Sequence, residues 1–67
     1  MYRLMFNVFT NTIISVENNG AQIPFDPANT DYQIFKAQIL NDEATLQDAD
    51  GVEMTPQAAK EFIRTLP

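Results

Sequence analysis

The sequence contains no cysteine, no histidine and no tryptophan, and it has only two glycines. Without cysteine it forms no disulfide bond and offers no thiolate as ligand or nucleophile. Without histidine it has no imidazole for zinc binding or proton transfer. These absences exclude disulfide-framed toxins, zinc fingers and Ser–His or Cys–His catalysis. The two glycines, Gly20 and Gly51, are too far apart to form a phosphate-binding loop.

Positive charge is scarce as well. Four lysines and arginines stand against nine acidic residues, which gives a formal net charge of −5 at pH 7. A free-standing nucleic-acid-binding protein is usually basic, because neutralising phosphates supplies most of its affinity. The acidic residues are expected in turns, at helix ends or on exposed faces, and not as a facing pair for acid–base catalysis. We therefore expect no nucleic-acid partner, no small-molecule substrate and no enzymatic activity.

Long apolar runs are also missing. No segment approaches the roughly 18–20 apolar residues of a membrane-spanning helix, and residues 1–9 lack the cleavage site of a signal peptide. We therefore expect no membrane partner. The 67 residues allow one small domain, spanning 1–67, and a chain this short buries only about 60% of its unfolded surface. Its hydrophobic content of 45% is too high for a disordered chain, and its marginal core favours a partner or a second copy.

The first 25 residues predict a three-stranded antiparallel meander. Alternating apolar residues over 2–9 predict the first strand, a β-branched run over 12–17 the second, and 21–25 a short third. The turn at 18–20 contains Asn and Gly, which accept the positive φ that hairpin loops require. Pro24 cannot donate to a neighbouring strand, so the third strand is expected at an edge or to end there.

Two helices are expected after the meander. A turn over 26–29 precedes a helix over 31–40, for which Thr30, or Asn29 one residue earlier, is the expected N-cap. Tyr32 begins an i, i+3, i+7 apolar stripe and is expected to pack back onto the sheet. The second helix is expected over 56–65. Thr55 is its N-cap, Pro56 its first residue, and an apolar stripe marks its buried side.

Residues 44–54 predict a second, short hairpin, with 44–47 and 52–54 on either side of the turn 48–51. The order ββ(β)-α-ββ-α indicates an α+β domain, in which a small antiparallel sheet is packed by two short helices. Structural roles are assigned to Pro24, Asp26, Pro27, Asn29, Thr30, Tyr32, Gly51, Thr55 and Pro56.

The acidic segment 48–53 has some likeness to a calcium-binding loop. If Gly51 takes the glycine position of an EF-hand loop, Leu46 and Gln57 fall where the first ligand and the bidentate glutamate are required. The pattern fails at both ends. We therefore interpret the segment as a hairpin turn with Gly51 at positive φ, and we expect no metal and no cofactor.

The apolar residues exceed what one sheet face and two short helices can cover. On the expected first and second strands, Met5, Phe9 and Ile13 point to the face opposite the helices, and Ile34 points away from the buried side of its helix. These residues are the interface candidates, with Arg3 nearby to offset repulsion between acidic molecules. The alternative is a two-layer core that buries them within the monomer.

Residues 23–33 read IPFDPANTDYQ, with two prolines, a helix cap and an aromatic residue at set offsets. This segment resembles one found in short proteins encoded in bacteriophage and prophage tail regions, roughly I-P-x-D-P-x-N-x-D-Y-x-x-Y/F. The resemblance covers about residues 2–40, and the ending 54–67 is more loosely similar to small phage proteins. The chain departs from the pattern where relatives usually carry an apolar residue and then Trp, because Lys36 and Gln38 stand there. It departs again at 42–43, where Gly-Asn is usual.

The resemblance implies a virion- or tail-associated structural or accessory protein, located in the virion and in the host cytoplasm during assembly. Its expected partners are other phage structural proteins or a second copy in a homo-oligomer. Two alternatives stay open at this point. One is an acidic phage inhibitor of a host protein, which would compete for a basic site. The other is a tail-assembly chaperone that is absent from the finished particle.

Overall fold

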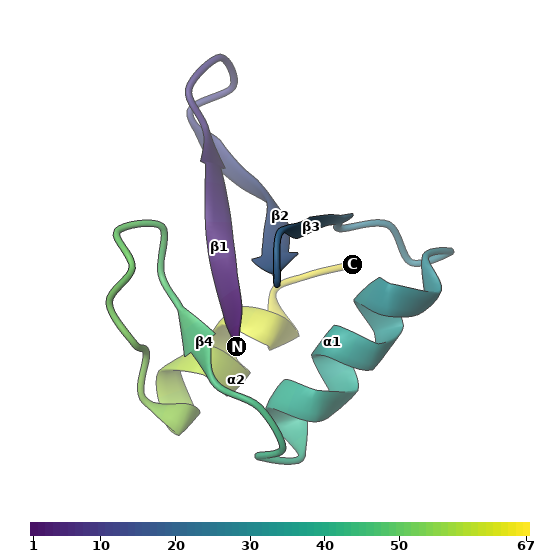
Figure 1. Cartoon of the computed structure of the whole chain (residues 1–67). Coiled ribbons are helices and arrows are strands. Elements are labelled where there is room, and N and C mark those ends of the chain that lie inside the picture. The colour runs from purple at the N-terminus through teal and green to yellow at the C-terminus, as the bar shows by residue number, and fades with distance from the viewer.

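The computed structural model describes residues 1–67 and contains four strands and two helices (Figure 1). In chain order these are β1 (Tyr2–Asn7), β2 (Thr12–Asn18), β3 (Ala21–Pro24), α1 (Thr30–Leu40), β4 (Leu46–Gln47) and α2 (Pro56–Arg64). The strands form one sheet in the order β3-β2-β1-β4. The α+β class, the meander and both helices are therefore as predicted. None of the helices has the length and apolar character that crossing a membrane would take.

The sheet is mixed, whereas the sequence predicted an antiparallel one. The pairs β1–β2 and β2–β3 are antiparallel, but β4 runs parallel to β1, with Tyr2 opposite Leu46 and Arg3 opposite Gln47. α1 lies between β3 and β4 in the chain, so β4 reaches β1 through a helical crossover instead of a tight turn. The second hairpin is shorter than predicted, because beyond β4 only Gln47 and Glu53 form a bridge.

The first hairpin differs from the prediction at its far end. β1 ends at Asn7, two residues short of the predicted strand, because Asn7 forms the turn itself. A β-bulge on β2 pairs Met5 with Ser15 but Phe6 with Ile13, leaving Ile14 as the extra residue. An extra residue reverses the alternation of a strand. Ile13 therefore packs against the core and not on the opposite face, where the sequence placed it.

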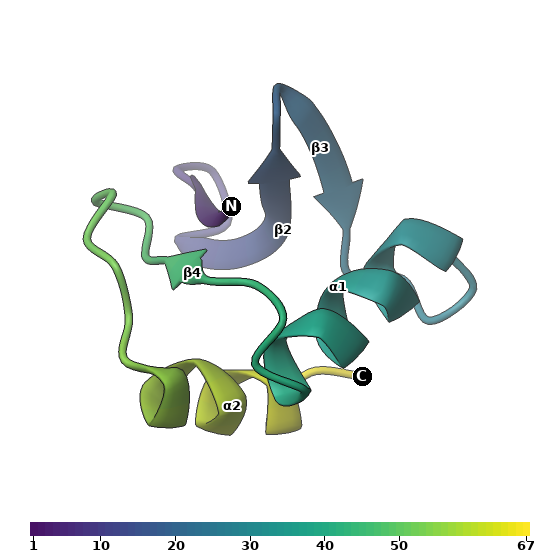
Figure 2. The ribbon, with the colours of Figure 1, turned by 60° about the horizontal axis from the view of Figure 1, so that its bottom comes forward.

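The core lies between the sheet and the two helices, which cover the same face of the sheet (Figure 2). Its centre is aromatic: the ring centroids of Tyr2 and Phe35 are 4.8 Å apart, and those of Phe25 and Tyr32 are 5.6 Å apart. The three predicted core positions of α1, Tyr32, Phe35 and Ile39, are all buried. The remaining buried apolar residues are Leu4, Val16, Ile23, Leu46, Ala59 and Ile63.

Both helices begin at capping residues. At α1 the cap is Asn29, the second of the two candidates, and its Oδ1 accepts from the Tyr32 N–H at 3.0 Å. Thr30 is the first helical residue, and its expected partner Gln33 instead donates to the Pro27 carbonyl at 2.8 Å. At α2 the prediction holds, since the Thr55 Oγ1 accepts from the Ala58 N–H at 3.2 Å.

The turns are also formed by residues whose side chains or backbone angles suit them. The Asp26 Oδ1 accepts from the Ala28 N–H at 3.0 Å, which shapes the turn before α1. Asn19 and Gly20 have φ of 52° and 84° and form the tight β2–β3 turn, as predicted. Gly51 has φ of 84° in the turn that follows β4, also as predicted.

Candidate interaction surfaces

The face of the sheet opposite the helices is mostly polar. Arg3 and Glu17 form an ion pair across β1 and β2 at 3.3 Å, and the Gln22 amide donates to the Ser15 hydroxyl at 3.0 Å. Met5 shares this face and is half-buried. The predicted apolar patch of Met5, Phe9 and Ile13 is therefore not formed, because the bulge turns Ile13 to the core and Phe9 lies in the turn after β1. Arg3, which was expected near this patch, pairs with Glu17.

The most exposed apolar side chains lie instead at the far end of the first hairpin. This hairpin projects from the rest of the molecule (Figure 1). We call Phe6, Val8, Phe9 and Ile14 the hairpin end. Their side chains are 47%, 74%, 95% and 44% exposed, respectively. Residues 4–16 contain no charged side chain, although the chain as a whole carries −5. Only Phe9 of this group was among the predicted interface residues.

Hydrogen bonds define the turn that carries Phe9. The Asn7 Oδ1 accepts from the N–H groups of Phe9 at 2.8 Å and Thr10 at 3.2 Å. The Asn7 carbonyl accepts from the N–H of Asn11, whose φ is 59°. The hydroxyls of Thr10 and Thr12 bond each other at 2.9 Å. The turn is therefore ordered by its own side chains, and Phe9 is exposed without being part of a loose loop.

The sequence contains a turn signal at this place, but the apolar alternation of residues 2–9 led to the prediction of a longer strand. Asn7 is followed by Thr10, Asn11 and Thr12, all residues that bond nearby backbone groups in turns. If Asn7 is interpreted as the first residue of a turn, the predicted strand ends before Val8. Val8 and Phe9 then belong to the exposed turn.

A polar cleft of about 300 Å³ lies where α1 meets the β2–β3 hairpin. Asp31, Ile34 and Gln38 line it from α1, and Tyr2 and Asn18 line it from the sheet. The Tyr2 hydroxyl donates to the Gln38 Oε1, while the Asn18 Oδ1 is buried without a hydrogen-bond partner. Burial, and in second place the charge of Asp31, raises the pKa of Tyr2. The predicted interface residue Ile34 is half-exposed here, away from the other candidates.

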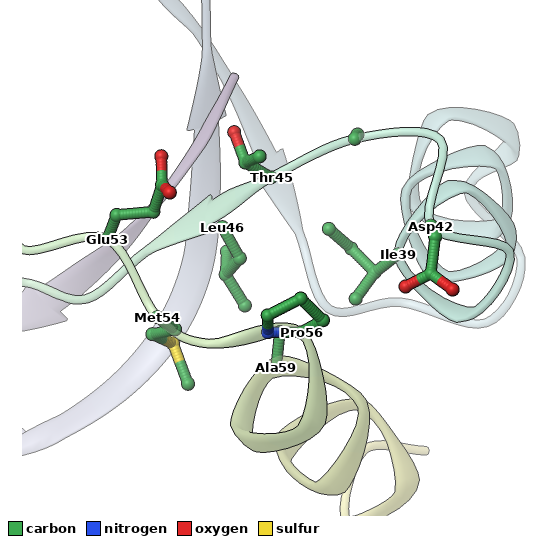
Figure 3. A pocket seen from close by; sticks show the side chains of 9 residues that line it. Ile39, Asp42, Thr45, Leu46, Glu53, Met54, Pro56 and Ala59 are labelled. Atoms are coloured by element: carbon green, nitrogen blue, oxygen red, sulfur yellow. The ribbon is translucent and has the colours of Figure 1, made fainter.

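A smaller, apolar cavity of about 120 Å³ lies between β4, the end of α1 and the start of α2 (Figure 3). Its walls include the buried side chains of Leu46 and Ala59, so it extends the core. Asp42 and Glu53 stand on opposite sides of it and do not face each other (Figure 3). Asp42 instead accepts from the Lys60 ammonium at 2.9 Å. The cavity therefore brings no pair of acidic groups together.

In the acidic turn 48–53, one carboxylate oxygen of Asp48 accepts hydrogen bonds from backbone N–H groups of the same turn. The Asp48 Oδ1 accepts from the N–H groups of Asp50 at 2.9 Å and Val52 at 3.0 Å. This is the Asx-type bonding that shapes a tight turn. The turn interpretation of this segment therefore accounts for Asp48 and Gly51 without a ligand.

The chain matches no family model, no curated protein and no solved structure. Two surfaces of the molecule are candidate binding sites. The surfaces are an ordered, uncharged hairpin end with exposed aromatic and aliphatic groups, and a polar cleft beside α1.

Proposed function

We propose that the protein is a small structural or accessory component of a phage particle, and that it acts by binding another protein through its hairpin end. The observation that carries the binding role is the exposure of Val8 and Phe9 on a turn ordered by Asn7. The phage setting is supported by the resemblance of residues 23–33 to proteins of phage tail regions.

The energetics favour a protein partner. Burying a Val or Phe side chain contributes about 1.5–3 kcal/mol, so Val8 and Phe9 together supply about 3–6 kcal/mol on binding. The turn is already ordered, so little of this is lost to fixing the backbone. The absence of charge over residues 4–16 keeps the repulsion of an acidic molecule away from the contact. A second copy and a different particle protein are both consistent partners.

The test is the presence of the chain in particles purified from the phage or prophage that encodes it, measured by mass spectrometry. We expect the chain in the particle, and we expect Phe9→Ser to reduce its content at least tenfold. Val52→Ser is the matched control, because Val52 is 61% exposed in the turn after β4, away from the hairpin end. Val52→Ser is expected to leave the content unchanged.

Two results would overturn this proposal. If the chain is missing from mature particles but present in tail-assembly intermediates, it is a chaperone. If it is missing from both and is recovered on a host protein, it is an inhibitor. Sedimentation at micromolar concentration identifies the partner class, since a monomer near 7.6 kDa excludes a stable homo-oligomer and leaves a different particle protein.

A further inference from the structure

One backbone edge of β1 is only partly paired. The Tyr2 N–H donates to the Thr45 carbonyl at 3.1 Å, so the backbone of Tyr2 faces β4. Alternate residues of a strand direct their N–H and C=O groups to the same side, so Phe6 faces that side as well. β4 ends at Gln47, which pairs with Arg3. The N–H and C=O groups of Phe6 therefore have no partner strand.

The segment that follows β4 leaves this edge open. The Asp48 N–H donates to the Val52 carbonyl at 2.8 Å, so the chain bonds to itself there and not to β1. The far half of β1 rises beyond both helices (Figure 1). The Phe6 side chain is accordingly 47% exposed, although Leu4, on the same side of the strand, is buried. Both the backbone edge and the ring of Phe6 are therefore accessible to another molecule.

The two edges of the sheet differ in how they are protected. β3, at the opposite edge, is four residues long and ends in Pro24, which has no N–H to donate. Short edge strands, prolines and charged side chains are the usual means by which proteins prevent pairing at an edge. The open part of the β1 edge lies in residues 4–16, which contain neither a charge nor a proline. Such an edge is a template for a strand of another chain.

We propose that the open edge of β1 pairs with the same edge of a second copy of this chain, as antiparallel strands related by a twofold axis at Phe6. In this register the Phe6 N–H of each copy donates to the Phe6 carbonyl of the other. The two Phe6 rings stand directly opposite each other, as a cross-strand aromatic pair. The contact is isologous, so one surface satisfies both copies.

This register agrees with the length of β4 and with the charges. With Phe6 opposite itself, Val8 falls opposite Leu4 of the second copy, one residue beyond the part of β1 that β4 covers. The uncharged hairpin end of each copy then lies beside the acidic turn 48–53 of the other, and the two acidic turns do not face each other. The arrangement limits repulsion between molecules that each carry −5.

The use of this dimer in a particle rests on the proposed function, but the pairing of the two copies does not. The edge supplies donors and acceptors that only an extended backbone matches. A second copy presents the same edge, the same exposed ring and the same uncharged segment, so it meets these requirements without a further protein.

The test is sedimentation equilibrium of the chain made by chemical synthesis, in which a single backbone N–H can be replaced by N–CH₃. We expect a concentration-dependent dimer, of twice 7.6 kDa, at micromolar concentration. N-methylation of Phe6 keeps the side chain, removes both central hydrogen bonds and blocks the close approach of the strands. It is therefore expected to weaken self-association by about tenfold or more.

N-methylation of Gln22 is the matched control at the β3 edge. The Phe25 N–H donates to the Ile14 carbonyl, so alternate residues of this segment face β2 and the Gln22 N–H points outward. The control is expected to leave self-association unchanged, and circular dichroism shows whether each modified chain is folded. In the unmodified chain, amide hydrogen exchange followed by NMR should slow at Phe6, and not at Gln22, as the protein concentration rises.

Three results would overturn the proposal. A monomer near 7.6 kDa would exclude the second copy; if the chain is nevertheless found in particles, the proposed function stands and the edge is left to a strand of a different protein. Equal weakening by the two methylations would remove the assignment to the β1 edge. A dimer that N-methylation of Phe6 leaves intact would show contact through side chains alone. A dimer that depends on the Phe6 N–H supports the pairing even if the chain is missing from particles.

Discussion

Tyr32 is one of the largest fully buried side chains of this small domain, and its replacement tests the packing directly. Its side chain is fully buried among Phe25 and Phe35, whose ring centroids lie 5.6 and 6.5 Å from its own. Its hydroxyl donates to the Pro67 carbonyl at 2.7 Å. Tyr32→Ala removes the whole ring and leaves a cavity between α1, β3 and the C-terminal segment.

The expected loss is large relative to the total. Replacing a buried aromatic residue by alanine costs about 3–5 kcal/mol. At roughly 0.05–0.15 kcal/mol per residue, a domain of this length has a free energy of unfolding of about 3–10 kcal/mol. Tyr32→Ala is therefore expected to remove a third or more of the stability, and to unfold the protein if its stability lies at the lower end.

Tyr32→Phe separates the ring from its hydroxyl. It keeps the aromatic packing and loses one hydrogen bond to an exposed carbonyl, so we expect a loss of about 0.5–1.5 kcal/mol. Ile34→Ala is the matched control on the same helix, because Ile34 is 46% exposed, and it is expected to cost less than Tyr32→Ala by at least 2 kcal/mol.

The assay is urea denaturation at 25 °C followed by far-ultraviolet circular dichroism, with the free energy taken by linear extrapolation. A loss below about 1 kcal/mol for Tyr32→Ala would refute the packing argument. So would a loss for Ile34→Ala equal to that for Tyr32→Ala, because exposure would then have no bearing on the cost.

Three further predictions concern other parts of the molecule. Asn29→Ala is expected to destabilise the protein by about 1 kcal/mol in the same urea assay, whereas Thr30→Ala, which removes no cap, is expected to cost less than half of that; equal losses would contradict the assignment of Asn29 as the cap. Burial raises the pKa of Tyr2 and Tyr32, so the neutral phenols are favoured in the folded state; this stability is complete below the unfolded pKa near 10 and is lost as pH rises through the higher folded values. Absorbance at 295 nm should show both tyrosines, the only two in the chain, ionising later in native protein than in urea, and coincident curves would be evidence against the burial argument. Millimolar calcium is expected to leave the melting temperature unchanged, and a rise that disappears in Asp50→Ala would show that the 48–53 turn is a calcium site.

The hairpin end and the polar cleft have different physical characters. The hairpin end is apolar, uncharged and held outward by its own hydrogen bonds, so it suits a recess on a partner protein. The polar cleft is concave, and Asp31 is the one charged residue that lines it.

Local chemistry in the sequence was enough to predict the three-stranded meander, both helices and their order in the chain. Thr55-Pro56 begins α2, Asn19-Gly20 forms the β2–β3 turn, and the spacing of Tyr32, Phe35 and Ile39 marks the buried side of α1. Each of these depends on residues within about one helical turn of each other, so neighbouring residues specify it.

The features that involve distant segments were decided only by the tertiary structure. β4 pairs in parallel with β1 because a helical crossover returns the chain there, and nothing within residues 44–47 specifies the partner strand. The bulge at Ile14 put Ile13 on the core side instead of the opposite face, since one extra residue reverses the alternation between the residues before it and those after it. The cleft joins Tyr2 and Asn18 to Asp31, Ile34 and Gln38, and only the packing of α1 against the sheet brings these residues together.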